Sequence, residues 1–291
     1  MLESWNIIMR SAIRITEEAV IIRAEGVDCP ATVYAFADTH LALHDERDAD
    51  ALAEWLEAPE PGFMHMSDLH LNRHLARAEE CKADLALAAG DLLHFPSRLN
   101  AEAAGQAFRD AVMPVLATPG NHDWCFPGQD DSVSGRRKFS KVLVPVTGKT
   151  PAFTTRHLAG VTFAAIDNAS RRVTRDQARQ ASKLLAEGGP VVLMMHIPVT
   201  LPTLREPARL KLGEVDLMND PDLAPAAERD LGDDDSTALL VDAMVTAPNL
   251  LAVVCGHLHL GREDSLSPSC VQIVVPPGCR DGHRLLRFEP W

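Results

Sequence analysis

Residues 115–123 read VLATPGNHD, an apolar run that passes through Pro119 and Gly120 into Asn121, His122 and Asp123. A short apolar run that ends in proline and glycine predicts a buried strand, with the polar side chains standing just beyond its carboxyl end. The same arrangement recurs four more times in this chain. The other groups at the ends of apolar runs are Asp38-Thr39-His40, Gly90-Asp91, His196 and Gly256-His257-Leu258-His259.

Strand and helix patterns alternate along the chain, which predicts the α/β class. Buried strands are expected at residues 33–37, Leu85–Ala89, Val115–Thr118, 191–195 and Leu250–Cys255, and earlier strands around Ile13, Ile15 and residues 19–22. Leu71, Leu75 and Ala78 have the spacing of a helix face, with Ser67 as its N-cap. Further helices are expected at residues 101–111 and from Thr174, which has capping-box spacing to Gln177, to about Gly188.

A single domain is expected over residues 1–291, because the five polar groups must converge on one site and they span most of the chain. Residues 1–31 would form an N-terminal strand extension. Residues 214–235 are rich in Asp and Glu and have little apolar periodicity. This segment is interpreted as a solvated surface loop, with a lid over the site as the alternative.

Composition limits the partners of the protein. The net charge of -13 disfavours nucleic acid and anionic membranes, although bound metals would supply local positive charge for a phosphate substrate. The first 14 residues contain no sustained apolar signal region, and no stretch approaches the ~18 apolar residues of a spanning helix. Six cysteines without a CxxC pair predict reduced, mostly buried thiols, and therefore a cytoplasmic location.

The five polar groups contain enough ligands for two metal ions that share one carboxylate, and they leave His122 free. The donors are carboxylate, imidazole and carboxamide groups, with no thiolate among them. Such a set suits divalent Mn, Fe, Zn, Ni or Co better than a structural zinc site.

Through these motifs, residues 32–260 resemble the calcineurin-like metallophosphoesterase superfamily. The resemblance implies a four-layer α/β/β/α sandwich with two mixed sheets, and a dinuclear metal site at the carboxyl ends of the strands. It implies that one metal is held by Asp38, His40 and His259, that the other is held by Asn121, His196 and His257, and that Asp91 bridges both. His122 would be the catalytic histidine that does not bind metal.

This resemblance implies hydrolysis of a phosphomonoester or phosphodiester by in-line attack of a metal-bridging hydroxide. His122 would donate a proton to the departing oxygen. Asp123 either orients a histidine or forms the turn. His94 either lies next to the metal ligands without binding a metal itself, or packs in the core. Arg172 and its neighbour Arg171 either reach a substrate phosphate or form ordinary surface charges.

A second Asp-x-His occurs at Asp68-Leu69-His70 and competes with Asp38 and His40 for the first motif. We favour Asp38, because residues 33–37 form the better strand by composition. Choosing Asp68 would leave only about a dozen residues for the crossover helix to the next strand, near the lower limit for a parallel connection. On this choice, His70 and His74 are expected at the surface.

Three features separate the chain from some relatives. Leu92-Leu93-His94 follows Asp91, and Asp123 stands where Ser/Thr protein phosphatases carry glutamate. The only tyrosine, Tyr34, precedes the first motif, which disfavours the tyrosinate centre of purple acid phosphatases.

The expected partner is a small phosphoester. The alternatives are a nuclease, for which no basic stripe is present, and a non-catalytic scaffold, which would be expected to have lost ligands. Neither the substrate nor the oligomeric state is predicted.

Overall fold

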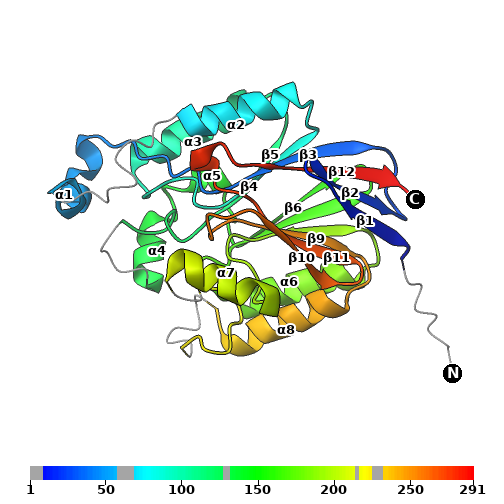
Figure 1. The fold of residues 1–291 in the computed structure, drawn as a ribbon. Coiled ribbons are helices and arrows are strands. Elements are labelled where there is room, and N and C mark those ends of the chain that lie inside the picture. The colour runs from blue at the N-terminus through cyan, green and yellow to red at the C-terminus, as the bar shows by residue number, and fades with distance from the viewer. Residues whose placement is uncertain (1–8, 58–68, 127–131, 214–215, 225–231) are drawn as a thin grey trace.

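The computed structural model describes residues 9–57, 69–126, 132–213, 216–224 and 232–291, in which two six-stranded sheets pack face to face (Figure 1). In spatial order the first sheet contains β1 (Ser11–Ile15), β2 (Ala19–Ala24), β12 (Arg284–Pro290), β3 (Ala31–Phe36), β4 (Leu85–Ala89) and β5 (Val115–Thr118). The second contains β10 (Arg262–Ser267), β11 (Cys270–Val274), β9 (Leu250–Cys255), β8 (Val191–Met194), β7 (Val161–Ile166) and β6 (Phe153–Leu158).

Both sheets are mixed. Strands β3, β4 and β5 run parallel, whereas β12 is antiparallel to β3 and parallel to β2. In the second sheet β7, β8, β9 and β11 are parallel, and β6 and β10 pair antiparallel at its two edges. The carboxyl ends of the parallel strands therefore lie at one edge of each sheet.

Helices cover the outer face of each sheet, so the fold has four layers (Figure 1). The first sheet packs against α2 (Leu69–Glu80), α3 (Arg98–Asp110) and α5 (Val144–Thr147), and the second against α6 (Arg175–Ala186) and α8 (Asp234–Thr246). The remaining helical segments are η1 (Glu46–Asp48), α1 (Ala49–Glu57), α4 (Val133–Phe139), α7 (Pro202–Leu212) and η3 (Gly278–Arg280). The expected α/β/β/α sandwich is confirmed.

The central strands are buried on both faces, which explains their unbroken apolar sequences. In β3, Val33 and Ala35 point into the core between the sheets, whereas Tyr34 and Phe36 point toward α2. This is the alternation that a pleated strand imposes on successive side chains. Among the described helices, none combines the length and apolar character that crossing a membrane requires.

The sequence located several of these elements. Strands β4, β5 and β9 have the predicted bounds, and the predicted capping box of Thr174 and Gln177 begins α6. Helix α3 starts at Arg98, three residues before the predicted 101, because the Ser97 side chain caps its amino end by accepting from the Asn100 backbone N–H (3.1 Å). The predicted N-cap Ser67 lies outside the described residues.

All six cysteines lie in the described part of the chain and are free thiols, as predicted. The expectation that they are mostly buried is wrong. Cys255 and Cys270 are buried, Cys29 is exposed, and the other three are half-buried.

The expected surface position of His74 is wrong, since its side chain is buried on the face of α2 that carries Leu71 and Leu75. The Tyr34 hydroxyl donates to His74 Nδ1 (2.9 Å), and His74 Nε2 donates to the Gly278 carbonyl (3.0 Å). The ring also stacks on Phe36, with centroids 5.2 Å apart. Burial lowers the pKa of His74 to about 4, so the ring is neutral at neutral pH.

His74 therefore makes folding stability depend on pH. In the unfolded chain His74 binds a proton below its ordinary pKa of 6.5, whereas in the folded chain it binds one only near pH 4. The free energy of unfolding therefore decreases as the pH falls through this window. The largest loss is about 3 kcal/mol. In urea unfolding between pH 7 and pH 4.5, we expect His74→Gln to lose less stability than wild type. Equal losses in the two proteins would contradict this assignment.

Candidate metal centre

Five loops carry the predicted metal ligands, and each follows the carboxyl end of a parallel strand. The loops after β3, β4 and β5 come from the first sheet, and those after β8 and β9 come from the second. Because the two sheets pack face to face, these ends meet at one edge of the sandwich. The structure places the predicted ligands Asp38, His40, Asp91, Asn121, His196, His257 and His259 on these loops.

The first cluster consists of Asp38, His40 and His259. His40 Nε2 lies 2.9 Å from His259 Nε2, which in turn lies 3.6 Å from Asp38 Oδ1. Asp38 and His40 are buried, and both Asp38 oxygens accept from the His257 backbone N–H. Two imidazole nitrogens and one carboxylate thus converge on one point, as ligands of a cation would.

The second cluster consists of Asp91, His196 and His257. Asp91 Oδ2 lies 3.2 Å from His196 Nε2 and 4.0 Å from His40 Nε2, so this carboxylate stands between the two clusters. His196 Nδ1 donates to the Ala89 carbonyl (2.8 Å). That hydrogen bond uses the proton on Nδ1, so a neutral His196 has its lone pair on Nε2. The lone pair then faces the Asp91 carboxylate, and a proton or a cation between the two atoms relieves the repulsion.

The residues present fit a metal centre in three respects. Asn121 Oδ1 and His196 Nε2 are buried, and neither has a hydrogen-bond partner among the described residues. A Cβ on Gly120 would lie 2.2 Å from Asp91 Oδ1, so only glycine leaves this carboxylate in place. The donors are nitrogen and oxygen atoms of the kind that divalent Mn, Fe, Zn and Ni accept.

Backbone strain is concentrated at the same residues. Asp38, His40, Asp91, His257 and His259 all have positive φ, between 47° and 73°. A non-glycine residue in this region costs of order 1–3 kcal/mol and persists where the surroundings demand it. Such strain is typical of functional sites.

Two of the clustered histidines, His40 and His259, have the neutral state that metal binding requires. Burial lowers the pKa of His40 well below its ordinary value and that of His259 to about 4, so both present neutral imidazoles. Burial would lower the pKa of His196 too, but Asp91 outweighs it and raises that pKa to about 10, so a metal ion would have to displace a proton from this ring. Burial raises the pKa of Asp38 to about 8, with Asp91 adding to the effect.

His122 and His94 form a stacked pair beside the first cluster, with ring centroids 5.1 Å apart. The His122 backbone N–H donates to Asp91 Oδ1 (2.9 Å), and its Nδ1 donates to the His94 carbonyl (3.3 Å). His94 Nδ1 lies 3.5 Å from His40 Nδ1, and these three histidines form a further group that could hold a metal. His94 is thus buried against the predicted catalytic and ligand histidines.

Asp123 holds two loops together. Its Oδ1 accepts from the Leu93 backbone N–H (2.8 Å), and its Oδ2 accepts from that of Gly120 (2.7 Å). Of the two roles that the sequence left open, these contacts support the turn-forming one.

Arg172 is buried, and its guanidinium donates to Asp234 (2.7 Å) and to the Ala224 carbonyl. These contacts hold the amino end of α8, and a contact of Arg172 with substrate stays a prediction. In the competing motif, Asp68 lies outside the described residues and His70 lies on α2.

Sequence reasoning missed Asp216, which contacts a predicted ligand. Asp216 Oδ2 accepts from His257 Nε2 (3.2 Å), and Asp216 Oδ1 accepts from Arg171 Nη1 (2.9 Å). Burial opposes ionisation of Asp216, but His257 and Arg171 outweigh it and lower the pKa to about 2. No signal in the acidic segment distinguishes Asp216 from its acidic neighbours.

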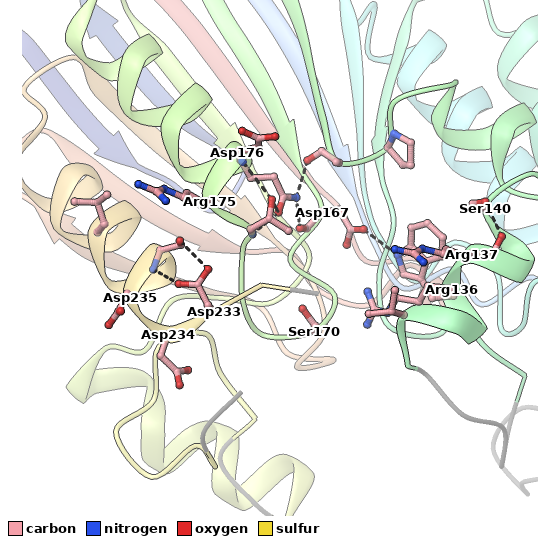
Figure 2. A pocket seen from close by; sticks show the side chains of 18 residues that line it. Arg136, Arg137, Ser140, Asp167, Ser170, Arg175, Asp176, Asp233, Asp234 and Asp235 are labelled. Atoms are coloured by element: carbon pink, nitrogen blue, oxygen red, sulfur yellow. Dashed lines mark hydrogen bonds between the residues drawn. The ribbon is translucent and has the colours of Figure 1, made fainter. Parts of the chain in front are cut away.

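A cavity of about 1250 Å³ opens between α4, α6 and α8 (Figure 2). Arg136 and Arg137 line it on the α4 side, and Asp233 to Asp235 line it on the α8 side. Trp124, from the loop that carries Asn121, also lines it. None of the seven predicted ligands is among its lining residues.

Known proteins resemble this chain in fold and in family sequence pattern. Purple acid phosphatase PPD1 from yellow lupin has a similar fold at 13% identity, with a TM-score of 0.53 over 91% of this chain and 47% of that one. A dimetal phosphatase from Danio rerio aligns at 12% identity and a TM-score of 0.49 over 86% of this chain and 88% of that one. The search of curated proteins found no match. Residues 31–261, well over half of the sequence, match the calcineurin-like phosphoesterase family model, and the chain belongs to that family.

Proposed function

We propose that the protein hydrolyses a small phosphomonoester or phosphodiester and that it does so with two divalent metal ions. The observation that carries the proposal is the position of Asp91, whose Oδ2 lies within 4.0 Å of a histidine nitrogen from each cluster. One shared carboxylate between two ligand clusters is the arrangement that a pair of neighbouring cations requires.

In this proposal one ion would be held by Asp38, His40 and His259, the other would be held by Asn121, His196 and His257, and Asp91 would serve both. Bound divalent ions stabilise negative charge on phosphoryl oxygens and lower the pKa of water toward neutrality. Manganese, iron, zinc and nickel all suit this donor set.

The other residues position the reaction. His122 lies beside the first cluster, where it can donate a proton to the departing oxygen. The His94 carbonyl accepts from His122 Nδ1 and fixes the direction of the ring. Because Nδ1–H is held by that carbonyl, Nε2 is the atom that would give a proton to substrate, and it does so from the ring that carries a proton on both nitrogens.

The net charge of -13 disfavours the alternative of a nuclease. A scaffold without catalysis is disfavoured because every ligand position is filled. The free thiols support our prediction of a cytoplasmic location.

The test is metal content together with turnover of a generic aryl phosphodiester and the matching monoester in added Mn²⁺. We expect two ions per chain and hydrolysis of at least one ester. Two bound ions without hydrolysis of either would favour the scaffold.

A paired substitution tests the choice of first motif. We expect Asp38→Asn to lose metal and to lower turnover by more than the ~10–100-fold that is typical of residues beyond the direct ligands. Asp68→Asn is the matched control and should keep both metal and turnover. The opposite result would assign the first motif to Asp68 and His70.

A further inference from the structure

Asp216, in the described part of the acidic segment 214–235, contacts a proposed ligand of the second metal site. His257 is buried, and its Nε2 donates to Asp216 Oδ2 across 3.2 Å. The two nitrogens of an imidazole point in different directions, and a neutral ring carries a proton on only one of them. With the proton on Nε2, the lone pair of His257 is on Nδ1.

Asp216 lies outside the ligand clusters themselves. His257 groups with Asp91 and His196, and Asp216 belongs to none of the potential metal groups found among the described residues. The ring of His257 packs against that of His196, with centroids 5.2 Å apart. The carboxylate of Asp216 therefore contacts the histidine rather than completing the cluster.

Arg171 holds the other oxygen of Asp216. Its Nη1 donates to Asp216 Oδ1 across 2.9 Å, and its backbone has a φ of 67°, which is uncommon for a residue with a side chain. The Arg171 backbone N–H donates to the Asn168 carbonyl (2.7 Å), and the Asn168 side chain accepts from the His196 backbone N–H (3.0 Å). The loop after β7 therefore contacts both histidines of the second cluster: His257 through Asp216, and the backbone of His196 directly.

The backbone beside Asp216 is anchored as well. Leu217 and Met218 are buried, and Met218 pairs with the loop that follows His196, donating to the Pro198 carbonyl (2.8 Å) and accepting from the Thr200 N–H (2.9 Å). A carboxylate on an anchored backbone can define the orientation of a histidine ring, whereas one on a solvated loop cannot.

We propose that Asp216 is a positioning residue for the second metal site: it fixes the ring of His257 with Nδ1 toward the metal, and Arg171 holds Asp216 in place. This inference rests on the proposed metal site and assigns part of the acidic segment to it. A carboxylate bonded to a ligand histidine typically changes metal affinity by ~10–100-fold.

The test is calorimetric titration of the metal-stripped, full-length chain with Mn²⁺. We expect Asp216→Ala to weaken one of the two binding events by ~10–100-fold and to leave the other close to wild type. Asp216→Asn should recover part of the loss, because its amide oxygen still accepts from Nε2. Arg171→Gln should weaken the same event by less, and combining it with Asp216→Ala should add little.

Asp222→Ala is the matched control. Asp222 belongs to the same segment and pairs with Arg205 rather than with a ligand. We expect its titration to equal that of wild type, and the melting temperatures of all metal-free variants to stay close together. A general loosening of the segment would weaken binding equally in Asp222→Ala and would overturn the proposal.

Wild-type affinities in Asp216→Ala would also overturn it, while leaving phosphoester hydrolysis intact. Two bound ions in wild type without any hydrolysis would instead reject the proposed function and leave the role of Asp216 standing. If Asp216→Ala does not fold, Arg171→Gln decides. Weaker binding of one ion supports the proposal, and unchanged binding rejects it.

Discussion

Replacing Asp91 with asparagine is expected to abolish tight binding of both metal ions and to lower turnover by more than ~100-fold, the upper end for residues that only support a ligand. The carboxylate stands between His196 and His40, and it carries the negative charge that the two clusters share. Asparagine keeps the shape but removes that charge, and its amide nitrogen has no lone pair for a metal. Metal analysis of the purified variant and turnover of an aryl phosphodiester measure the two effects.

Asp84→Asn is a matched control for this prediction, because Asp84 precedes β4 just as Asp91 follows it. Its carboxylate accepts from the Thr32 backbone N–H (2.8 Å), a bond that an asparagine oxygen can keep. Metal content and turnover should not change in this variant. An Asp91→Asn protein that still binds two ions would contradict the shared-carboxylate arrangement.

The parts of the fold that the sequence predicted are those set by local patterns. The run Val115–Thr118 is apolar and ends at Pro119 and Gly120, so both the strand and its polar end could be read from neighbouring residues. Strand β12 is different. It comes from the carboxyl end of the chain and inserts between β2 and β3, a pairing set by tertiary packing that no local pattern encodes.

The candidate site divides in the same way. The identities of the clustered side chains followed from their positions at strand ends, whereas the positive φ angles of Asp38 and His257 are not visible in sequence. Asp216 was missed because its role depends on a contact across 41 positions of sequence. His74 is the exception, because it lies three residues after Leu71 and one before Leu75, and its place on the buried face could have been predicted.

His122→Ala is the second large effect that we expect, with turnover falling by ~10²–10⁴-fold while both ions stay bound. The contact between His122 and Asp91 uses the backbone N–H, which alanine keeps. The side chain is thus removed without disturbing the shared carboxylate. Turnover of an alkyl ester should suffer more than that of an aryl ester, because a poor leaving group depends more on the proton that His122 donates.

Metal retention separates this role from direct ligation, because His122 also groups with His40 and His94 as a set that could hold a metal. If His122 were a ligand, the alanine variant would bind fewer ions, and its defect would be similar for alkyl and aryl esters. His157→Ala is the matched control, since His157 is exposed on β6 and bonds to Thr162. That variant should keep wild-type turnover on both esters, so a selective loss in His122→Ala would locate the proton donor at this ring.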